Sequence, residues 1–278
     1  MKRNIIRILV AAYIVSATIL SCEPMEPDSY TEDFYQIATV QFINDKASLL
    51  MDVSGNRYYP KNFATKSDMN RFEVAHGDRV IALMNLYAVG NIANNKLTLK
   101  KLYKYPIHPL AESRPVDSIY NYKYQLQQKV YNRGSSYTQL TYAKAWPQGH
   151  LVNVMPEYTI SSEDVEAQFY LYPIEVKDNA LVMRLYSNIP DTLPAKFSDY
   201  SFFCFDLSTL RNQVADSMEQ AHRDTILSQL EALNKDTINV EVWEPEIMRD
   251  LFRNGDEIKE RKYYNPRAYA TLRVPFDF

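Results

Sequence analysis

The sequence predicts a mainly β protein whose second half carries one long helix. Short runs of β-branched and aromatic residues alternate with polar residues along most of the chain, and 22 tyrosines suit sheet faces that are half buried. Residues 208–235 instead repeat apolar residues at multiples of four positions, which is typical of an amphipathic helix. A chain of 278 residues fits one large or two small domains. We therefore expect two β domains, of which the second is a sandwich with the helix packed on it.

Five strands in the first half predict a small, barrel-sized unit. Tight turns at residues 54–56 and 76–78 and a polar segment at residues 91–95 separate several of these strands. The expected strands are residues 35–42, 49–53, 57–59, 80–87 and 96–103.

Three prolines then mark the expected domain boundary. Pro106, Pro109 and Pro115 interrupt both helices and central strands, so we place the first domain at residues 33–112 and the second at residues 113–278. The clearest strand of the whole chain follows at residues 120–131, where apolar and polar residues alternate. The remaining short strands, numerous enough for a sandwich, are residues 151–154, 169–172, 181–186, 201–205, 238–243 and 268–274.

Two helices are expected in the second domain. The long one begins at Ser208 as its N-cap and ends near Lys235. His222 falls on its apolar row, where a histidine is far more often a packing residue than a metal ligand. A second, shorter helix is expected over residues 246–252, and Asn254 with Gly255 would end it.

The N-terminus has the pattern of a bacterial lipoprotein signal. Lys2, Arg3 and Arg7 form a positively charged start, and residues 5–20, which include Arg7, are otherwise almost wholly apolar. The small residue Ser21 and then Cys22 follow. The run is shorter than the roughly 20 residues that usually span a membrane. We predict that residues 1–21 are removed as a signal peptide and that acylated Cys22 anchors the chain to the membrane. An ordinary signal peptide or a short membrane helix is the alternative.

An acidic tether, residues 22–32, follows the signal. Removal of residues 1–21 takes away three positive charges, so the net charge changes from −3 for the full chain to −6 for the mature chain. Carboxylates crowd the first twelve residues of the mature chain: Glu23, Glu26, Asp28, Glu32 and Asp33. A solvated spacer explains this composition, and the alternative is an export signal, because such residues resemble those of surface lipoproteins in the Bacteroidetes. We expect a lipid-anchored outer-membrane protein, with exposure at the cell surface left open.

Four short motifs stand out in the mature chain: residues 72–80, 146–154, 179–185 and 200–208. Together they resemble the NigD-like lipoproteins of Bacteroides and related bacteria. The resemblance covers most of the mature chain and implies an N-terminal OB-like β-barrel followed by a C-terminal β-sandwich. It brings no established enzymatic activity. The chain departs from the family in the helix after Leu210 and in an insert, residues 244–266, whose role is left open.

The composition disfavours several classes of function. Only 6 glycines leave little material for phosphate-binding loops, and a net charge of −3 supplies no basic field for nucleic acid. We therefore expect neither a cofactor nor a nucleic-acid partner. The 4 histidines and 2 cysteines show no metal-ligand spacing, so we expect no metal site.

No catalytic residue is predicted either. The chain has no G-x-S-x-G motif. Cys204 lies in an apolar strand, where a thiol is usually buried and inert. Glu163 and Asp164 are adjacent, and neighbouring residues of a strand point to opposite faces, so a solvated turn explains them better than a pair of catalytic carboxylates.

The leading hypothesis is a non-enzymatic envelope protein that binds a protein or glycan partner through the barrel face or the sandwich edge. OB-type barrels bind ligands across one sheet face. Candidate stacking residues there are Tyr58, Tyr59, Tyr87, Tyr103 and Tyr105. Two alternatives stay open: a glycan- or peptide-active enzyme with its site at the domain junction, and a bacteriocin-related immunity or self-protection protein. A cleft with convergent carboxylates would favour the enzyme, and an exposed aromatic patch would favour binding.

Overall fold

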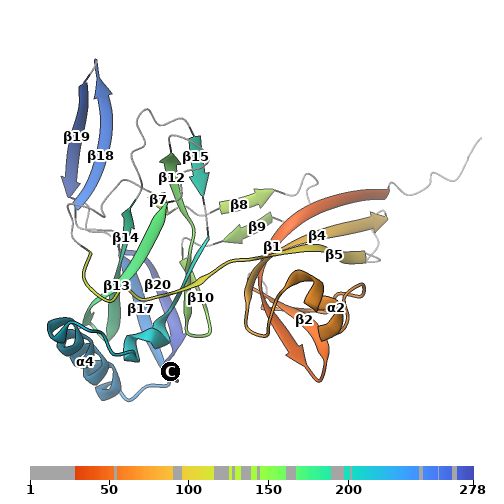
Figure 1. The fold of residues 1–278 in the computed structure, drawn as a ribbon, viewed down its shortest axis with the longest axis horizontal. Helices are drawn as coiled ribbons and strands as arrows, with labels where there is room; N and C mark the ends of the chain where they lie inside the picture. Colours follow the sequence, from red (N-terminus) through yellow and green to blue (C-terminus); the bar gives the residue numbers. More distant parts are fainter. Residues whose placement is uncertain are drawn as a thin grey trace, which may run out of the picture.

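The protein is mainly β in the computed structural model, as the sequence predicts (Figure 1). The described residues are 29–52, 55–89, 96–115, 125–126, 129–132, 139–142, 145–160, 167–188, 197–200, 202–243, 247–255, 257–264 and 268–278. The expected signal peptide, Cys22 and residues 23–28 of the acidic segment lie outside them.

Five antiparallel strands form the first sheet, in the order β3-β2-β1-β4-β5. They are β1 (Ser29–Ile43), β2 (Lys46–Met51), β3 (Arg57–Tyr58), β4 (Arg79–Val89) and β5 (Lys96–Lys104). All five overlap the expected strands, although β1 and β2 begin earlier than expected. Within the described ranges β3 and β5 do not pair, so the sheet is open and the OB-like barrel is not closed. Because β1 begins at Ser29, the last residues of the expected tether belong to this sheet.

A short helical segment covers one face of the first sheet. It consists of α2 (Lys66–Met69) and η1 (Asn70–Phe72). Thr65 and Asp68 form a reciprocal capping box, since the Thr65 hydroxyl accepts from the Asp68 amide at 3.1 Å and the Asp68 carboxylate accepts from the Thr65 amide at 3.0 Å. Met69 is fully buried in the core that this segment and the sheet enclose. A segment of one turn is too short for a periodicity to predict it.

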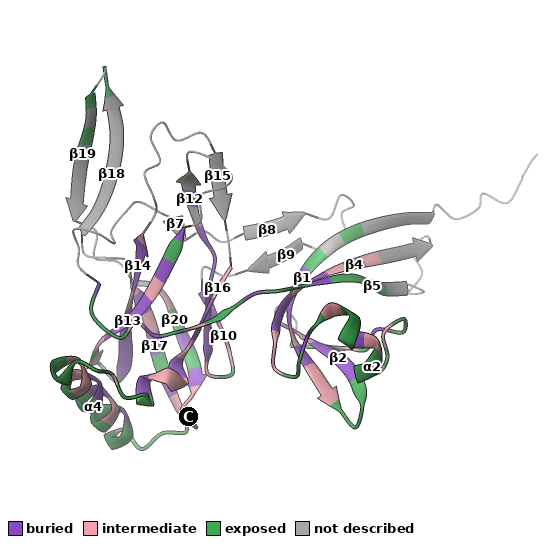
Figure 2. Ribbon diagram, viewed as in Figure 1, coloured by how far each residue is buried: buried purple, intermediate pink, exposed green. Residues whose placement is uncertain are grey.

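Two four-stranded sheets enclose the core of the second half (Figure 2). The first has the order β10-β11-β16-β6, with β6 (Ile107–Pro109), β10 (Ala145–Gln148), β11 (Leu151–Val154) and β16 (Phe203–Asp206). The second has the order β13-β14-β17-β20, with β13 (Gln168–Lys177), β14 (Ala180–Asn188), β17 (Thr237–Trp243) and β20 (Ala268–Pro275). Since β6 pairs in parallel with β16, residues 107–109 hydrogen-bond to the second half, although we assigned them to the first domain. The division at residue 112 itself stays a prediction.

Smaller sheets complete the fold. β7 (Gln125–Leu126), β12 (Pro156–Ile160) and β15 (Phe197–Tyr200) form one, and β8 (Lys129–Asn132) and β9 (Gln139–Tyr142) form another. The expected strand at residues 120–131 falls partly outside the described residues. Its described parts, β7 and β8, pair with different strands, namely β12 and β9.

The shorter of the two expected helices is wrong. Residues 247–254 form β18 (Ile247–Asn254), which pairs along its whole length with β19 (Glu257–Tyr264). The sequence of β18 places apolar pairs four residues apart, which mimics a helix, but pairing with β19 overrides that local pattern. Gly255 does end the element, because it has a φ of 65° in the turn between the strands, a conformation that glycine adopts readily.

The long helix is shorter than expected. α4 (Ser217–Ala232) begins nine residues after Ser208, which instead lies in a 3₁₀ turn, η2 (Leu207–Arg211). Asp216 explains the later start, because its carboxylate accepts hydrogen bonds from the amides of Met218 at 2.8 Å and Glu219 at 3.2 Å. The apolar row therefore becomes buried only further along the helix, and Met218 is 82 % exposed. Among the described residues, no helix is both long and apolar enough to cross a membrane.

Replacing this cap should destabilise the protein measurably. We expect Asp216→Ala to lower the free energy of unfolding by about 1 kcal/mol, because two helix amides lose their acceptor. Asp224→Ala removes an exposed carboxylate within the same helix and should cost only a few tenths of a kcal/mol, about the value of its side-chain pair with Gln220. Urea unfolding followed by circular dichroism measures both, and equal losses would contradict the assignment of the cap.

Candidate functional site

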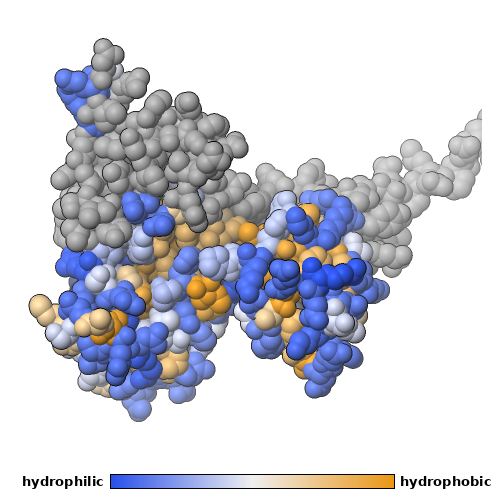
Figure 3. Space-filling view, viewed as in Figure 1, coloured by the Kyte–Doolittle hydropathy of each residue, from blue (hydrophilic) through white to orange (hydrophobic). Residues whose placement is uncertain are grey.

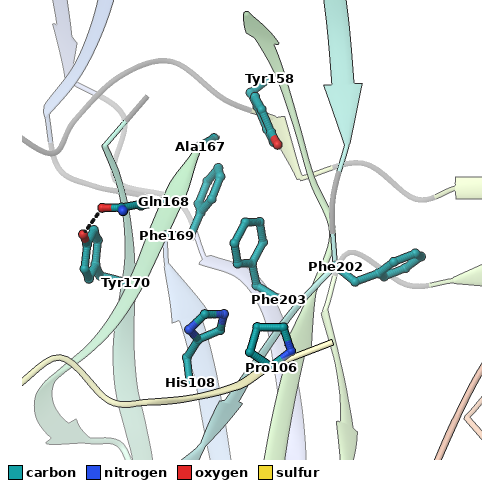
Figure 4. Close-up of a pocket in the computed structure, with 9 residues that line it drawn as sticks. All are labelled: Pro106, His108, Tyr158, Ala167, Gln168, Phe169, Tyr170, Phe202 and Phe203. Carbon is teal, nitrogen blue, oxygen red and sulfur yellow. Dashed lines mark hydrogen bonds between the residues drawn. The ribbon is translucent and has the colours of Figure 1, made fainter. Parts of the chain in front are cut away.

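An aromatic pocket opens between two edge strands of the second half (Figure 4). On one side of the core the two sheets approach each other, because β10 lies beside β20. The opposite edges, β6 and β13, are joined where the Ala111 amide donates to the Leu171 carbonyl at 2.9 Å. Beside this link a cavity of about 360 Å³ remains open, and we call it the aromatic pocket. Its lining residues are Pro106, His108, Tyr158, Ala167, Gln168, Phe169, Tyr170, Phe202 and Phe203.

Closely spaced, mutually tilted rings form the inner wall of the aromatic pocket. Phe169 of β13 and Phe203 of β16 have ring centroids 4.7 Å apart, and Tyr158 of β12 lies 5.6 Å from Phe169. His108 of β6 lies 6.0 Å from Phe203. Tyr158 and Phe169 are nearly fully buried, so the hydrophobic core itself reaches the surface here. In the space-filling view, hydrophobic side chains gather on the surface over this part of the second half (Figure 3).

The rim of the aromatic pocket is polar and includes the His108 imidazole. The Tyr170 hydroxyl donates to the Gln168 carboxamide oxygen at 2.6 Å, and Gln168 is exposed. None of the described lining residues carries a carboxylate. The arrangement can stack an apolar or aromatic group and hydrogen-bond its edge, but it offers no acid–base pair.

The five candidate tyrosines of the first half do not form one stacking surface. Tyr58 packs against the first core, and burial raises the pKa of its hydroxyl to about 12. Tyr105 is buried beside Arg79, whereas Tyr59 and Tyr103 are exposed at 53 % and 39 %. The Tyr87 side chain lies outside the described residues. The aromatic pocket was missed because its rings come from four strands that are far apart in the sequence, and each strand alone reads as core.

The junction between the two halves is a buried polar cluster. Arg79, at the start of β4, donates through Nη1 to Asp52 at 2.7 Å and to Thr39 at 2.6 Å, and through Nη2 to the second Asp52 oxygen. From the second half, the Asn153 carboxamide oxygen accepts from Arg79 at 3.0 Å, and Trp146 Nε1 donates to Asp52 at 2.7 Å. The side chains of Arg79 and Asp52 have no exposure to solvent.

The surroundings of this junction cluster favour the charged form of Arg79, although the cluster is shielded from solvent. Burial is the largest single effect on the Arg79 guanidinium and lowers its pKa, but the hydrogen bonds to Asp52 and the surrounding charge interactions together outweigh burial and raise the pKa overall. Burial also raises the pKa of the nearby Cys204 thiol to about 12, so the thiol stays protonated and unreactive. Two of the four sequence motifs, residues 72–80 and 146–154, meet here through Arg79 and Asn153. Because its charged groups are shielded from solvent, the cluster joins the halves and presents no cleft to a substrate.

The described histidines lie apart from one another, and His222 and His76 each contact different neighbours. His222 stacks on Tyr172 with ring centroids 5.8 Å apart, and its Nε2 lies 3.0 Å from the Pro173 carbonyl oxygen, so it packs α4 against β13 as expected. His76 accepts a hydrogen bond from the Phe42 amide at 2.9 Å in the turn before β4. In the part of the chain that the structure describes, no group of three or more histidine, cysteine or acidic side chains is placed to hold a metal ion.

Comparison with known proteins gives likenesses of fold only. No family model matches the chain, and no curated protein is significantly similar to it. A "putative lipoprotein" from Bacteroides fragilis is 12 % identical with a TM-score of 0.46, over 89 % of this chain and 100 % of that one. An uncharacterised protein from Parabacteroides merdae is 13 % identical with a TM-score of 0.48, over 88 % of this chain and 100 % of that one. A NigD-like immunity protein from Bacteroides caccae is 9 % identical with a TM-score of 0.37, over 84 % of this chain and 96 % of that one.

Proposed function

We propose that this chain is a membrane-anchored protein of the cell envelope that binds a partner through the aromatic pocket. The observation that carries the proposal is the pocket itself, where buried rings of the core reach the surface between β6 and β13. A cavity of about 360 Å³ falls within the range of ligand sites, roughly 300–1,000 Å³. It suits an apolar or aromatic group presented by a protein or a glycan.

Binding fits the chemistry of the aromatic pocket better than catalysis does. Hydrolysis of a glycosidic or peptide bond needs a positioned acid and base, or a nucleophile with its base. The described lining of the pocket supplies one imidazole and no carboxylate. Arg79 and Asp52, the charged pair at the junction, are shielded from solvent. These two features together favour a binding protein over an enzyme with a junctional site.

Anchoring at Cys22 would hold the first sheet close to the membrane. Six residues separate Cys22 from Ser29, where β1 begins. An extended chain of that length reaches roughly 25 Å at most. The carboxylates of this segment support display at the outer surface of the outer membrane, where the aromatic pocket would meet extracellular partners. In either orientation the second half carries the binding site.

Small probes test the pocket directly. We expect the purified lipoprotein in detergent to give saturation-transfer NMR signals with N-acetylphenylalanine amide or with methyl β-D-glucoside. Tyr170→Ala removes a rim ring and should weaken that binding about three- to tenfold, because an aromatic contact contributes roughly 0.5–1.5 kcal/mol. Tyr59→Ala removes an exposed tyrosine from the first half and should leave binding unchanged. Absence of binding by both probes, or equal binding by Tyr170→Ala, would refute the site.

A further inference from the structure

A second concavity, different in chemistry from the aromatic pocket, lies at one end of the sheet β13-β14-β17-β20. It has a volume of about 340 Å³ and is lined by Asn179, Lys235, Thr237, Asn239 and Arg273. β14, β17 and β20, which lie side by side in Figure 1, supply or adjoin all five residues. We call it the cationic pocket.

Strand register holds the centre of the cationic pocket in place. Asn239 of β17 lies opposite Arg273 of β20, and both side chains are exposed. The alternate residues of the same strands, such as Ile238 and Leu272, are buried in the core, so the polar set faces outward. The Thr237 hydroxyl accepts from Arg273 Nε at 3.1 Å, which orients the guanidinium and leaves its terminal nitrogens available.

Turns at the ends of the strands position the other two side chains. Asn179 follows Asp178 in the turn from β13 to β14, where both residues have positive φ, 51° and 63°, as a tight hairpin requires. Lys235 lies between the end of α4 and the start of β17, after Asn234, whose φ of 49° reverses the chain. Both side chains are therefore carried on short, constrained connections.

Apart from Arg273 Nε, the side-chain donors of the cationic pocket are unused in the described part of the chain, and its lining residues include no carboxylate. In the described ranges the side chains of Lys235, Asn179 and Asn239 make no hydrogen bond or ion pair. The described lining contains two cations and no carboxylate. The next outward residue of β17, Glu241, accepts a hydrogen bond from Trp243 Nε1 at 2.8 Å and does not line the pocket. An anionic ligand would satisfy these groups.

We infer that the cationic pocket binds a carboxylate-bearing sugar, such as a uronic acid residue of an acidic glycan. The guanidinium of Arg273 and the ammonium of Lys235 match a carboxylate, since arginine pairs with it in a bidentate manner. The two asparagine carboxamides offer acceptors as well as donors, which suits the hydroxyl groups of a sugar ring. Inorganic phosphate carries only one or two hydroxyl donors near neutral pH, fewer than the several hydroxyl groups of a sugar ring, so it matches these carboxamide acceptors less well. This site lies on residues separate from the aromatic pocket and does not depend on its function.

Titration of the purified lipoprotein with sodium glucuronate, glucose and inorganic phosphate tests the inference. We expect glucuronate to bind at millimolar concentration and to bind more tightly than glucose or phosphate. Arg273→Gln and Lys235→Gln should each weaken glucuronate binding tenfold or more, because a hydrogen bond to a charged group is lost. Arg57→Gln and Lys61→Gln are the matched controls, because each removes an exposed positive charge from the first half. Arg57 resembles Arg273 in donating a hydrogen bond through Nε, in this case to Gln41. Both control variants should bind glucuronate as the wild type does.

Three outcomes would overturn the inference. Glucuronate could fail to bind, or it could bind equally well to Arg273→Gln and to the wild type. Phosphate could bind as tightly as glucuronate, which would reduce the site to a simple anion pocket. Thermal unfolding of each variant shows that the fold is retained, which these exposed positions allow.

Discussion

Arg79→Ala should lower the free energy of unfolding by about 3–5 kcal/mol, the usual effect of removing one partner of a buried ion pair. The Asp52 carboxylate would stay buried after the change, with only Trp146 Nε1 as a described hydrogen-bond donor. Asn153 would also lose its donor, so contacts from both halves weaken together. Chemical denaturation measures the loss, provided that unfolding remains a single transition.

Two companion variants separate the buried charge from other effects of the substitution. Arg57→Ala removes an exposed arginine from the same sheet and should change stability by no more than about 0.5 kcal/mol. The double variant Arg79→Met with Asp52→Leu removes both charges and should recover much of the loss, because no unpaired ion remains. If Arg79→Ala were as stable as Arg57→Ala, the junction cluster would not join the two halves.

Cys22→Ser should abolish lipidation completely. The thiol is the only acyl acceptor that the lipoprotein pathway can use at this position, so the variant is expected to be soluble or uncleaved. Metabolic labelling with a palmitate analogue, followed by immunoprecipitation, measures the modification. Cys204→Ala provides the control, since that thiol is buried in β16 and should not affect labelling. Equal label on Cys22→Ser and the wild type would end the lipoprotein assignment.

Several strand positions were predictable from short apolar or alternating runs in the sequence. Residues 151–154 form β11 with the expected bounds, and the expected strands at residues 80–87 and 96–103 lie within β4 and β5. Alternation of buried and exposed side chains is a local property, so the sequence displays it directly. Closure of a barrel depends on which strands pair, which is not local, so the sequence does not show that the sheet β3-β2-β1-β4-β5 is open in the described part of the chain.

Both errors in the helices arise from competition between local signals. Ser208 has the right chemistry for an N-cap, but Asp216 caps a later start and Asp206 caps the preceding 3₁₀ turn. The segment that forms β18 has the apolar spacing of a helix, and only the eight-residue pairing with β19 shows that it is a strand. The spacing of the apolar residues, which predicted both helices, indicates neither the competing caps nor the pairing with β19.

The aromatic pocket and the junction cluster depend on contacts across the fold. Phe169 and Phe203 are 34 positions apart in the chain, and each sits in a strand whose apolar residues read as ordinary core. Arg79 and Asn153 belong to two separate motifs of the sequence, but nothing in either motif indicates that they meet. Residue type and spacing predict the elements, whereas the sites form where the edges of those elements come together.

Site-specific photo-cross-linking in living cells tests the central claim most directly, because it asks whether the aromatic pocket contacts a partner in the envelope. Tyr170 is replaced by p-benzoylphenylalanine in the full-length protein, and Tyr59 is replaced in a matched control. We predict a discrete protein or glycan adduct from position 170 that is absent from position 59. No adduct from position 170, or the same adducts from both positions, would contradict binding through the pocket.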